Sequence, residues 1–180
     1  MLITVLNIWA KGFISRGGAR MGRNKIESLD ITGWKILEEL QKNSRISYKD
    51  LANRVGLSCS PLIERIKRME EDGLIKGYTT LLDTDMMGFV IIAIIELRYN
   101  SSKDEEMLSE TFLDHPSVLQ YWITTGDNDF ILETIFPSVQ DMNSFLVFLA
   151  KYGQTRSYII LEKSPLKPIT KETVYGSSDQ

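Results

Sequence analysis

The sequence predicts an α+β protein in two parts, a helical part followed by a part in which strands and helices alternate. Between residues 30 and 73, apolar residues recur at helical spacing in three short segments. From residue 89 onward, β-rich runs alternate with two helical stretches. The charges divide in the same way, since residues 1–80 carry 14 Lys and Arg against 9 Asp and Glu, whereas residues 81–180 carry 7 against 15.

The composition limits the possible classes of protein. Apolar residues make up 43% and charged residues 25% of the 180 residues, as in an ordinary soluble chain of one large or two small domains. One cysteine, Cys59, excludes an internal disulfide framework, and one histidine, His115, leaves no zinc-ligand set. We therefore expect no metal or other cofactor. The basic first half predicts contact with a polyanion, and chance clustering of charges is the alternative.

Residues 1–28 are predicted to be an extension or linker, possible in two forms. Leu2, Leu6, Trp9 and Phe13 fall on one helical stripe, which favours a short amphipathic helix. The alternative is an extension of the reading frame upstream of a start at Met21. The apolar run is too short for a membrane span, and no basic stretch precedes it.

Two helices are predicted at the start of the helical part. The first spans residues 30–43, with Asp30 or Thr32 as its cap. The second begins at Ser47, which forms a capping-box pattern with Asp50. An apolar face follows, and Gly56 is the residue expected at the end of this helix.

A third helix and a hairpin complete the helical part. The helix begins at Ser58 or Ser60, tolerates Pro61 in its first turn and stops at Asp72-Gly73. Its buried face is predicted to hold Leu62, Ile66 and Met69. Residues 74–82 are typical of a short hairpin with Lys76-Gly77 at its tip.

Three short helices, a tight turn and a β-wing describe a winged helix-turn-helix, whose third helix enters the major groove of DNA. Its first residues would reach base edges, and basic residues along it would contact phosphates. The predicted DNA-binding residues are Ser47, Ser58, Cys59, Ser60, Glu64, Arg65, Lys67, Arg68 and Lys76. The alternative is a solvated helix face, because Glu64–Arg68 and Lys67–Glu71 are spaced as i,i+4 ion pairs.

The second part contains six predicted elements. They are a strand at 89–99, a helix at 103–114, strands at 118–125 and 130–136, a helix at 139–149 and a strand at 155–163. Gly126-Asp127-Asn128-Asp129 separates the two middle strands and has the composition of a hairpin turn.

Many spaced residues between 29 and 163 resemble the leucine-responsive regulator family (Lrp/AsnC, or feast/famine regulators). They are Leu29-Asp30, Ile36-Leu37, Leu40-Gln41, Arg45-Ile46-Ser47, Leu51-Ala52, Arg54-Val55-Gly56-Leu57-Ser58, Glu64-Arg65-Ile66-Lys67-Arg68-Met69-Glu70 and Gly73-Leu74-Ile75-Lys76-Gly77-Tyr78. The resemblance implies a second domain, the RAM domain, with a ferredoxin-like βαββαβ fold that binds an effector. Two helices on one side of its sheet would leave an apolar face for pairing across a dimer.

The resemblance also implies a small-molecule site, because the Gly126–Asp129 turn is similar to the family's Gly-Asp-x-Asp signature. The predicted effector-binding residues are Gly126, Asp127, Asp129, Thr155 and Ser157. An aspartate there suits the ammonium group of a free amino acid, whereas an ordinary hairpin turn is the alternative. The chain departs from the family at Gly33, where an acidic residue is usual, and at Tyr152-Gly153-Gln154, which replaces a Pro-Gly-Val turn.

The resemblance thus implies a sequence-specific, DNA-binding transcriptional regulator whose assembly or DNA affinity responds to a small molecule, an amino acid. We expect a homodimer that assembles further into a tetramer or octamer, in the cytoplasm of a bacterium or archaeon and associated with its nucleoid. The expected domains are an extension at 1–28, a DNA-binding domain at 29–82, a RAM domain at 88–164 and a tail at 165–180.

Two other functions are considered. One is a DNA-architectural or interaction protein of the same fold that acts without a ligand. The other is an enzyme, but the sequence holds no nucleophile–base–acid set and no phosphate loop. His115 lies beside Pro116 at a predicted helix end, where a capping or surface residue is expected. We therefore predict that the chain is not an enzyme.

Overall fold

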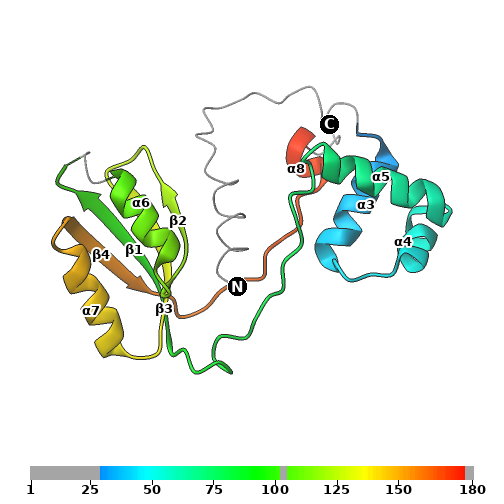
Figure 1. Cartoon of the computed structure of the whole chain (residues 1–180). Coiled ribbons are helices and arrows are strands. Elements are labelled where there is room, and N and C mark those ends of the chain that lie inside the picture. The colour runs from blue at the N-terminus through cyan, green and yellow to red at the C-terminus, as the bar shows by residue number, and fades with distance from the viewer. Residues whose placement is uncertain (1–28, 102–104, 177–180) are drawn as a thin grey trace. The chain divides into compact units, whose positions relative to one another are not determined.

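The computed structural model describes residues 29–101 and 105–176 (Figure 1). These residues form two compact units. One comprises residues 82–164, and the other combines residues up to 81 with residues 165–176. The expectations for residues 1–28 fall outside the described residues. No helix among the described residues is long and apolar enough to cross a membrane.

Three helices form the first unit, as predicted: α3 (Ile31–Lys42), α4 (Tyr48–Val55) and α5 (Cys59–Glu71). Local capping explains where the first two begin. The Asp30 side chain accepts a hydrogen bond from the Gly33 amide at 2.7 Å, and Ser47 accepts one from the Asp50 amide at 3.1 Å. The helix start at Asp30 therefore forms although Gly33 provides no acidic side chain there.

The turn between α4 and α5 depends on Gly56. This residue has φ +72°, a left-handed conformation that glycine adopts without steric cost, and it ends α4. The turn directs α5 across the unit so that Leu62, Ile66 and Met69 pack into the core. The helix-turn-helix arrangement is confirmed.

The expected hairpin at residues 74–82 is not formed. This segment contains no strand, and its described contacts return to α5. The Ile75 amide donates to the Met69 carbonyl at 3.0 Å, and the Tyr78 hydroxyl donates to Glu70 at 2.8 Å. Because this segment bonds to α5 and forms no strand pairs within itself, the expected wing is an extended segment rather than a hairpin.

The C-terminal residues complete the helical unit with a short helix, α8 (Lys171–Tyr175), begun by a capping box between Thr170 and Thr173. Figure 1 shows α8 in this unit, beyond the extended chain that leaves the sheet. The Tyr175 ring meets the Trp34 ring of α3 edge to face, with centroids 6.2 Å apart. The expected tail is therefore packed against the first helix.

The second unit has the predicted order of elements. They are β1 (Ile91–Tyr99), α6 (Glu105–Asp114), β2 (Val118–Ile123), β3 (Phe130–Phe136), α7 (Val139–Leu149) and β4 (Gly153–Ile159). All strand pairs are antiparallel, and the order across the sheet is β2-β3-β1-β4. This arrangement confirms the ferredoxin-like α+β fold.

The two faces of this sheet differ. Along β1, buried residues such as Ala93 and Ile95 alternate with half-buried ones, and the buried set joins a core to which α6 and α7 contribute. The intervening Ile92 and Ile94 lie on the helix-free face, where their register neighbours include Ile135 and Tyr158. The predicted apolar second face is therefore present.

The last strand is shorter than predicted. The Ile160 amide still donates to the Ile92 carbonyl at 2.8 Å, but residues 161–163 leave the sheet. The Lys163 ammonium forms an ion pair with Glu133 of β3, whose side chain is 12% exposed. With Lys163 paired to Glu133, the chain no longer continues along β4, which ends at Ile159. The β-propensity of the sequence alone placed this end at residue 163.

Candidate nucleic-acid interface and effector site

The exposed N-terminal end of α5 is the candidate nucleic-acid interface. Ser58 is its N-cap residue but makes no side-chain capping hydrogen bond. Ser58, Cys59 and Ser60 are all exposed. Short polar side chains at this end of a recognition helix are placed to meet base edges in the major groove.

Arg65 lies differently from the other basic residues of α5. Its guanidinium forms two hydrogen bonds of 2.9 Å to the carboxylate of Asp30, the cap of α3. The hydrogen bond from the Gly33 amide is the main cause that lowers the pKa of Asp30. Desolvation opposes this shift, and the hydrogen bond and charge of Arg65 add to it. The Arg65–Asp30 pair joins the middle of α5 to the start of α3, a role for Asp30 that spacing in the sequence does not reveal.

The remaining basic residues of α5 are exposed. Lys67 and Arg68 have side chains 72% and 74% exposed, and their i,i+4 partners Glu71 and Glu64 lie 3.6 Å away. Exposed pairs of this length contribute little stability, so these cations can exchange a carboxylate for a phosphate. Lys76, in the extended segment after α5, is also exposed.

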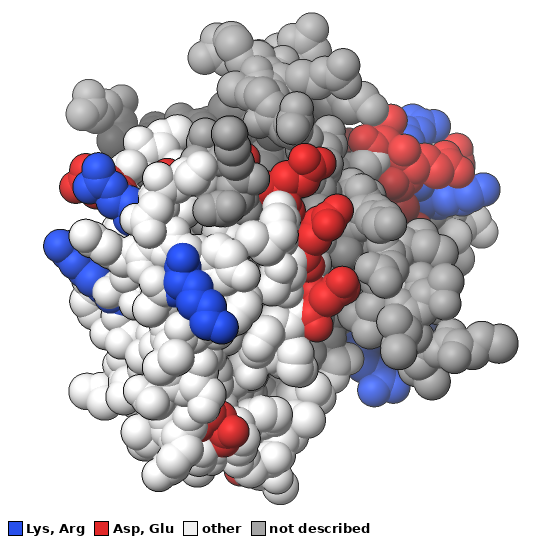
Figure 2. All heavy atoms as spheres, turned by 60° about the vertical axis from the view of Figure 1, so that its left-hand side comes forward, with Lys and Arg blue, Asp and Glu red and all other residues white. Residues whose placement is uncertain are grey.

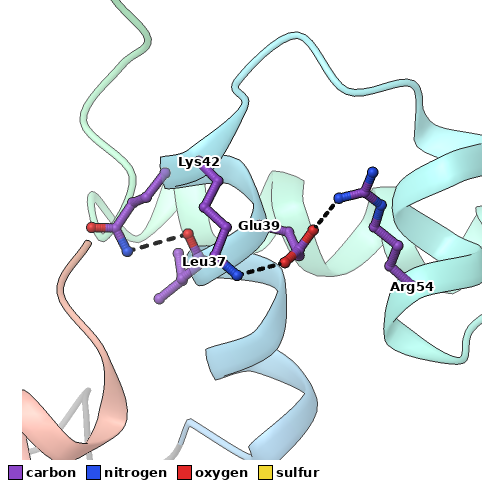
Figure 3. Close-up of polar contacts among 5 residues, drawn as sticks. Leu37, Glu39, Lys42 and Arg54 are labelled. Carbon is purple, nitrogen blue, oxygen red and sulfur yellow. Dashed lines mark hydrogen bonds and ion pairs between the residues drawn. The ribbon is translucent and has the colours of Figure 1, made fainter. Parts of the chain in front are cut away.

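Ser47 is exposed at the start of α4, where it bonds Asp50. Elsewhere in the unit, Glu39 of α3 forms ion pairs with Lys42 at 2.8 Å and with Arg54 of α4 at 2.6 Å (Figure 3). Hydrogen bonds from Lys42 and then Arg54 are the main causes that lower the pKa of the Glu39 carboxyl. The Glu39 carboxylate thus links α3 to α4.

The charge of the described helical unit is close to balanced. Residues 29–81 carry nine Lys and Arg against eight Asp and Glu, so much of the basic excess of the first half comes from residues before 29. Residues 82–164 carry five against thirteen. In Figure 2, where the left-hand unit of Figure 1 is in front, uncharged residues dominate and few Lys and Arg are visible.

The candidate effector turn lies at the end of β1. The Asp129 amide donates to the Leu97 carbonyl, and its carboxylate accepts from the Tyr99 amide, both at 2.9 Å. The side-chain amide of Asn128 donates to the Glu96 carboxylate at 3.0 Å. Gly126 and Asp127 are exposed. The turn is therefore fixed to β1 through residues 128 and 129, while Asp127 is presented to solvent.

The candidate residues of β4 lie at the same end of the sheet. Leu97 of β1 pairs with Phe130, which follows the turn, and on its other side with Thr155. Two strand spacings, about 10 Å, therefore separate the turn from Thr155. Thr155 is half-buried, whereas Ser157 is exposed.

Sequence reasoning did not include Tyr99 and Glu105 in this site. The Tyr99 hydroxyl donates to Glu105 at 3.1 Å. Burial, then this bond and the charges of Asp129 and Glu105, raise the pKa of Tyr99. The fold places Tyr99 beside Asp129 of the turn, and Glu105 beside Tyr99. No motif in the sequence indicates these contacts.

Gly153 at the start of β4 has a steric requirement. A Cβ atom there would lie 2.0 Å from the Arg98 carbonyl oxygen, far closer than atoms can approach. Only glycine allows β4 to meet β1 at this point. At Tyr152-Gly153-Gln154, which replaces the Pro-Gly-Val turn expected from the resemblance, the backbones of β1 and β4 are therefore in direct contact.

His115 takes a structural place. Its Nδ1 accepts from the Ser117 amide at 3.1 Å, and its ring packs on Phe145 with centroids 4.5 Å apart. Burial lowers the pKa of this imidazole. This bond joins His115 to the turn after α6 rather than to a helix carbonyl, so it is not the expected cap, and the ring is half-buried rather than on the surface. Among the described residues, no group of three His, Cys, Asp or Glu could hold a metal ion.

Comparisons with known proteins match both units. A family model described as winged helix-turn-helix DNA-binding matches residues 29–76, and one described as the Lrp/AsnC ligand binding domain matches residues 91–167. A leucine-responsive regulatory protein of Haemophilus influenzae is 30% identical over 150 residues, which cover 80% of this chain and 90% of that protein.

Two solved structures resemble the fold closely. A transcriptional regulator of Neisseria meningitidis in complex with L-Met has a TM-score of 0.73 and 26% identity, and the match covers 78% of this chain and 94% of that one. LrpC of Bacillus subtilis has a TM-score of 0.72 and 27% identity, with 77% and 99% covered.

Proposed function

Since the chain belongs to the Lrp/AsnC family of transcriptional regulators, we propose that it binds DNA as a homodimer through α5 and that an amino acid controls this binding. It is a regulator with a helix-turn-helix and a ligand-binding domain, not an enzyme. The observation that carries the proposal is the exposed start of α5, which follows the Gly56 turn.

The proposed DNA contacts follow from exposure and pairing. Ser58, Cys59 and Ser60 read base edges, and Lys67 and Arg68, with Lys76 and Ser47, contact phosphates. Glu64 lies at the same exposed face and modulates Arg68. Arg65 positions α5 through Asp30. We therefore propose residues 29–82 as the DNA-binding domain, with the protein in the cytoplasm and associated with the nucleoid.

Assembly is proposed to use the helix-free face of the sheet. Ile94, Tyr158 and Trp122 lie on it by register, and the last two are 50% and 44% exposed. Apolar residues of this size favour association with a second copy. A two-fold pair of residues 88–164 would place two copies of α5 on one DNA site, and further pairing would give a tetramer or octamer.

The proposed effector is a free amino acid. The related Neisseria regulator was solved with L-Met, and Asp127, with Gly126, Asp129, Thr155 and Ser157, presents polar groups at one end of the sheet in this chain. An exposed carboxylate suits an α-ammonium group, and backbone and hydroxyl groups suit an α-carboxylate. The ligand changes DNA affinity only if it prefers one assembly over another.

Binding of the purified full chain to DNA upstream of its own gene tests this function. Affinity is measured across a salt series against random DNA of equal length, with and without the twenty amino acids. We expect preference for the specific DNA, an affinity that falls with salt, and a shift caused by at least one amino acid. An Asp127→Asn variant should lose the shift but keep the affinity.

Two outcomes would contradict parts of the proposal. Equal affinity for random DNA at every salt concentration would remove the regulator assignment for that operator. Specific binding indifferent to every amino acid, together with no thermal shift, would favour the ligand-independent architectural protein.

A further inference from the structure

The surface of α3 that faces away from the core of the helical unit holds residues 169–175. The Gln41 side chain pairs with a single tail residue in both directions. Its Nε2 donates to the Ile169 carbonyl at 2.9 Å, and its Oε1 accepts from the Ile169 amide at 2.8 Å. A side-chain amide thus satisfies both backbone groups of one residue, as a neighbouring β-strand would.

Trp34 forms the second contact of this surface. Its side chain is not part of the aliphatic core of the unit, yet it is only 6% exposed. Tyr175 packs against it with the ring planes at 81°. Ile169 and Tyr175 themselves stay 58% and 51% exposed, so the tail lies shallowly and can leave without unfolding the unit.

The tail is also held at its other end. Lys163 pairs with the nearly buried Glu133 on the helix-free face of the sheet, and the Gln120 amide donates to the same carboxylate at 2.6 Å. Burial raises the pKa of Glu133, but Lys163 and Gln120 outweigh it and lower the pKa overall. The carboxylate is therefore charged at neutral pH and keeps Lys163 in place.

The distance between these two anchors is short. Ile169 lies six positions after Lys163, a reach of about 20 Å when extended. Pro165 and Pro168 stiffen this span. The other described passage between the units runs from Tyr78, held by Glu70, to Val90, held by Phe136. Val90 lies twelve positions after Tyr78, a reach of about 40 Å when extended.

The unit of residues 82–164 is called the ligand-binding unit below, and the helical unit is called the DNA-binding unit. We infer that residues 164–176 form a strap whose docking on α3 gives the DNA-binding unit a second and shorter attachment to the ligand-binding unit. The surface formed by Trp34 and Gln41 is the docking site, and its occupant is the chain's own C-terminal segment. With the strap docked, the 20 Å span limits the separation of the units. With the strap released, the 40 Å linker sets the limit.

Hydrogen exchange of the full-length protein tests docking. In a Gln41→Ala variant, the peptide covering residues 169–176 should exchange at least tenfold faster, because the Ile169 amide loses its acceptor. Peptides from α5 should be unchanged. Gln140→Ala, which removes an exposed helical glutamine of α7, is the matched control and should leave residues 169–176 as they are.

Distance measurement tests the tether. Labels at the exposed Cys59 of α5 and at a Gln140→Cys site on α7 report the separation of the units, in samples diluted with excess unlabelled chain. Ending the chain after Ser164 should widen the distance distribution and shift it upward. Ending it after Gly176, which keeps the whole strap, should change nothing.

Either measurement can overturn the inference. Unchanged exchange of residues 169–176 in Gln41→Ala would show that the strap is not docked on α3 in solution. An unchanged distance distribution after removal of residues 165–180 would show that the strap does not limit the units. Neither result involves DNA, so failure of the strap and failure of the proposed function are distinguishable.

Discussion

The DNA-binding unit has a described core of seven buried apolar residues without an aromatic ring, whereas the core of the ligand-binding unit has twelve, four of them phenylalanines. A small core contributes less to stability than a large one. The smaller unit also has polar links between its helices, Arg65–Asp30 and Glu39–Arg54, but these pairs are partly exposed and add little stability. The difference predicts that stability is concentrated in the ligand-binding unit, where we also propose assembly, and that DNA recognition belongs to the other unit.

The largest expected effect separates the two cores. Phe130→Ala removes a fully buried ring that contacts three other aromatic rings and should cost about 3–5 kcal/mol. Denaturant unfolding should show this loss together with dissociation of the assembly. Hydrogen exchange of peptides from α5 should stay near the rate found in the unaltered chain. Equal acceleration in both units would mean that they unfold as one.

The next effect should be confined to DNA affinity. Replacing Lys67 and Arg68 together with Ala should reduce the slope of log affinity against log salt by about 2 and weaken binding about 10–100-fold at low salt. Assembly should be unaffected. Lys151→Ala, on the acidic unit, is the control. A slope equal to that of the unaltered chain would exclude these residues from phosphate contact.

A smaller effect is expected where the strap begins. Lys163→Met leaves the nearly buried Glu133 carboxylate without its cation and should cost about 1–2 kcal/mol, less than for a fully buried pair because Lys163 is half exposed. The Lys163→Met/Glu133→Gln double variant should recover most of the loss. Chemical unfolding measures both. If the double variant is no more stable than the single one, the pair is not what holds this segment.

The smallest effect concerns pH. Burial lowers the pKa of His115 in the folded chain below its ordinary value of 6.5. Protons therefore bind the unfolded chain preferentially, so stability is complete above pH 6.5 and falls as pH drops toward the folded pKa. His115→Asn keeps an acceptor for the Ser117 amide and should flatten this dependence. A thermal-unfolding series from pH 5 to 8 measures it, and an identical slope in the variant would contradict this account.

Features set by neighbouring residues could be predicted from the sequence. Ser47 with Asp50 fixes the start of α4, and Gly56 fixes its end, because capping and left-handed turns act within a few residues. The order of elements in the sheet unit also follows from local patterning. The suggested caps at Asp30 and Ser58 were likewise correct.

Features set by distant partners could not be predicted. The contact of Arg65 with Asp30 could not be predicted because the two residues lie 35 positions apart, while the DNA contact expected of Arg65 stays a prediction. The wing and the end of β4 differed from the prediction because Tyr78 and Lys163 form side-chain contacts, with Glu70 of α5 and Glu133 of β3, in place of strand pairing. Gln41 and Ile169 are 128 residues apart, and no spacing rule links them.

The position of the C-terminal segment on the DNA-binding unit has a practical consequence for work with this protein. A purification tag or fluorescent protein fused after Gln180 would be carried by the DNA-binding unit, only a few residues beyond the Tyr175–Trp34 contact. Such a fusion would load the smaller unit with extra mass and could displace α8. An insertion at an exposed site of the ligand-binding unit, such as Gln140, would leave that contact undisturbed.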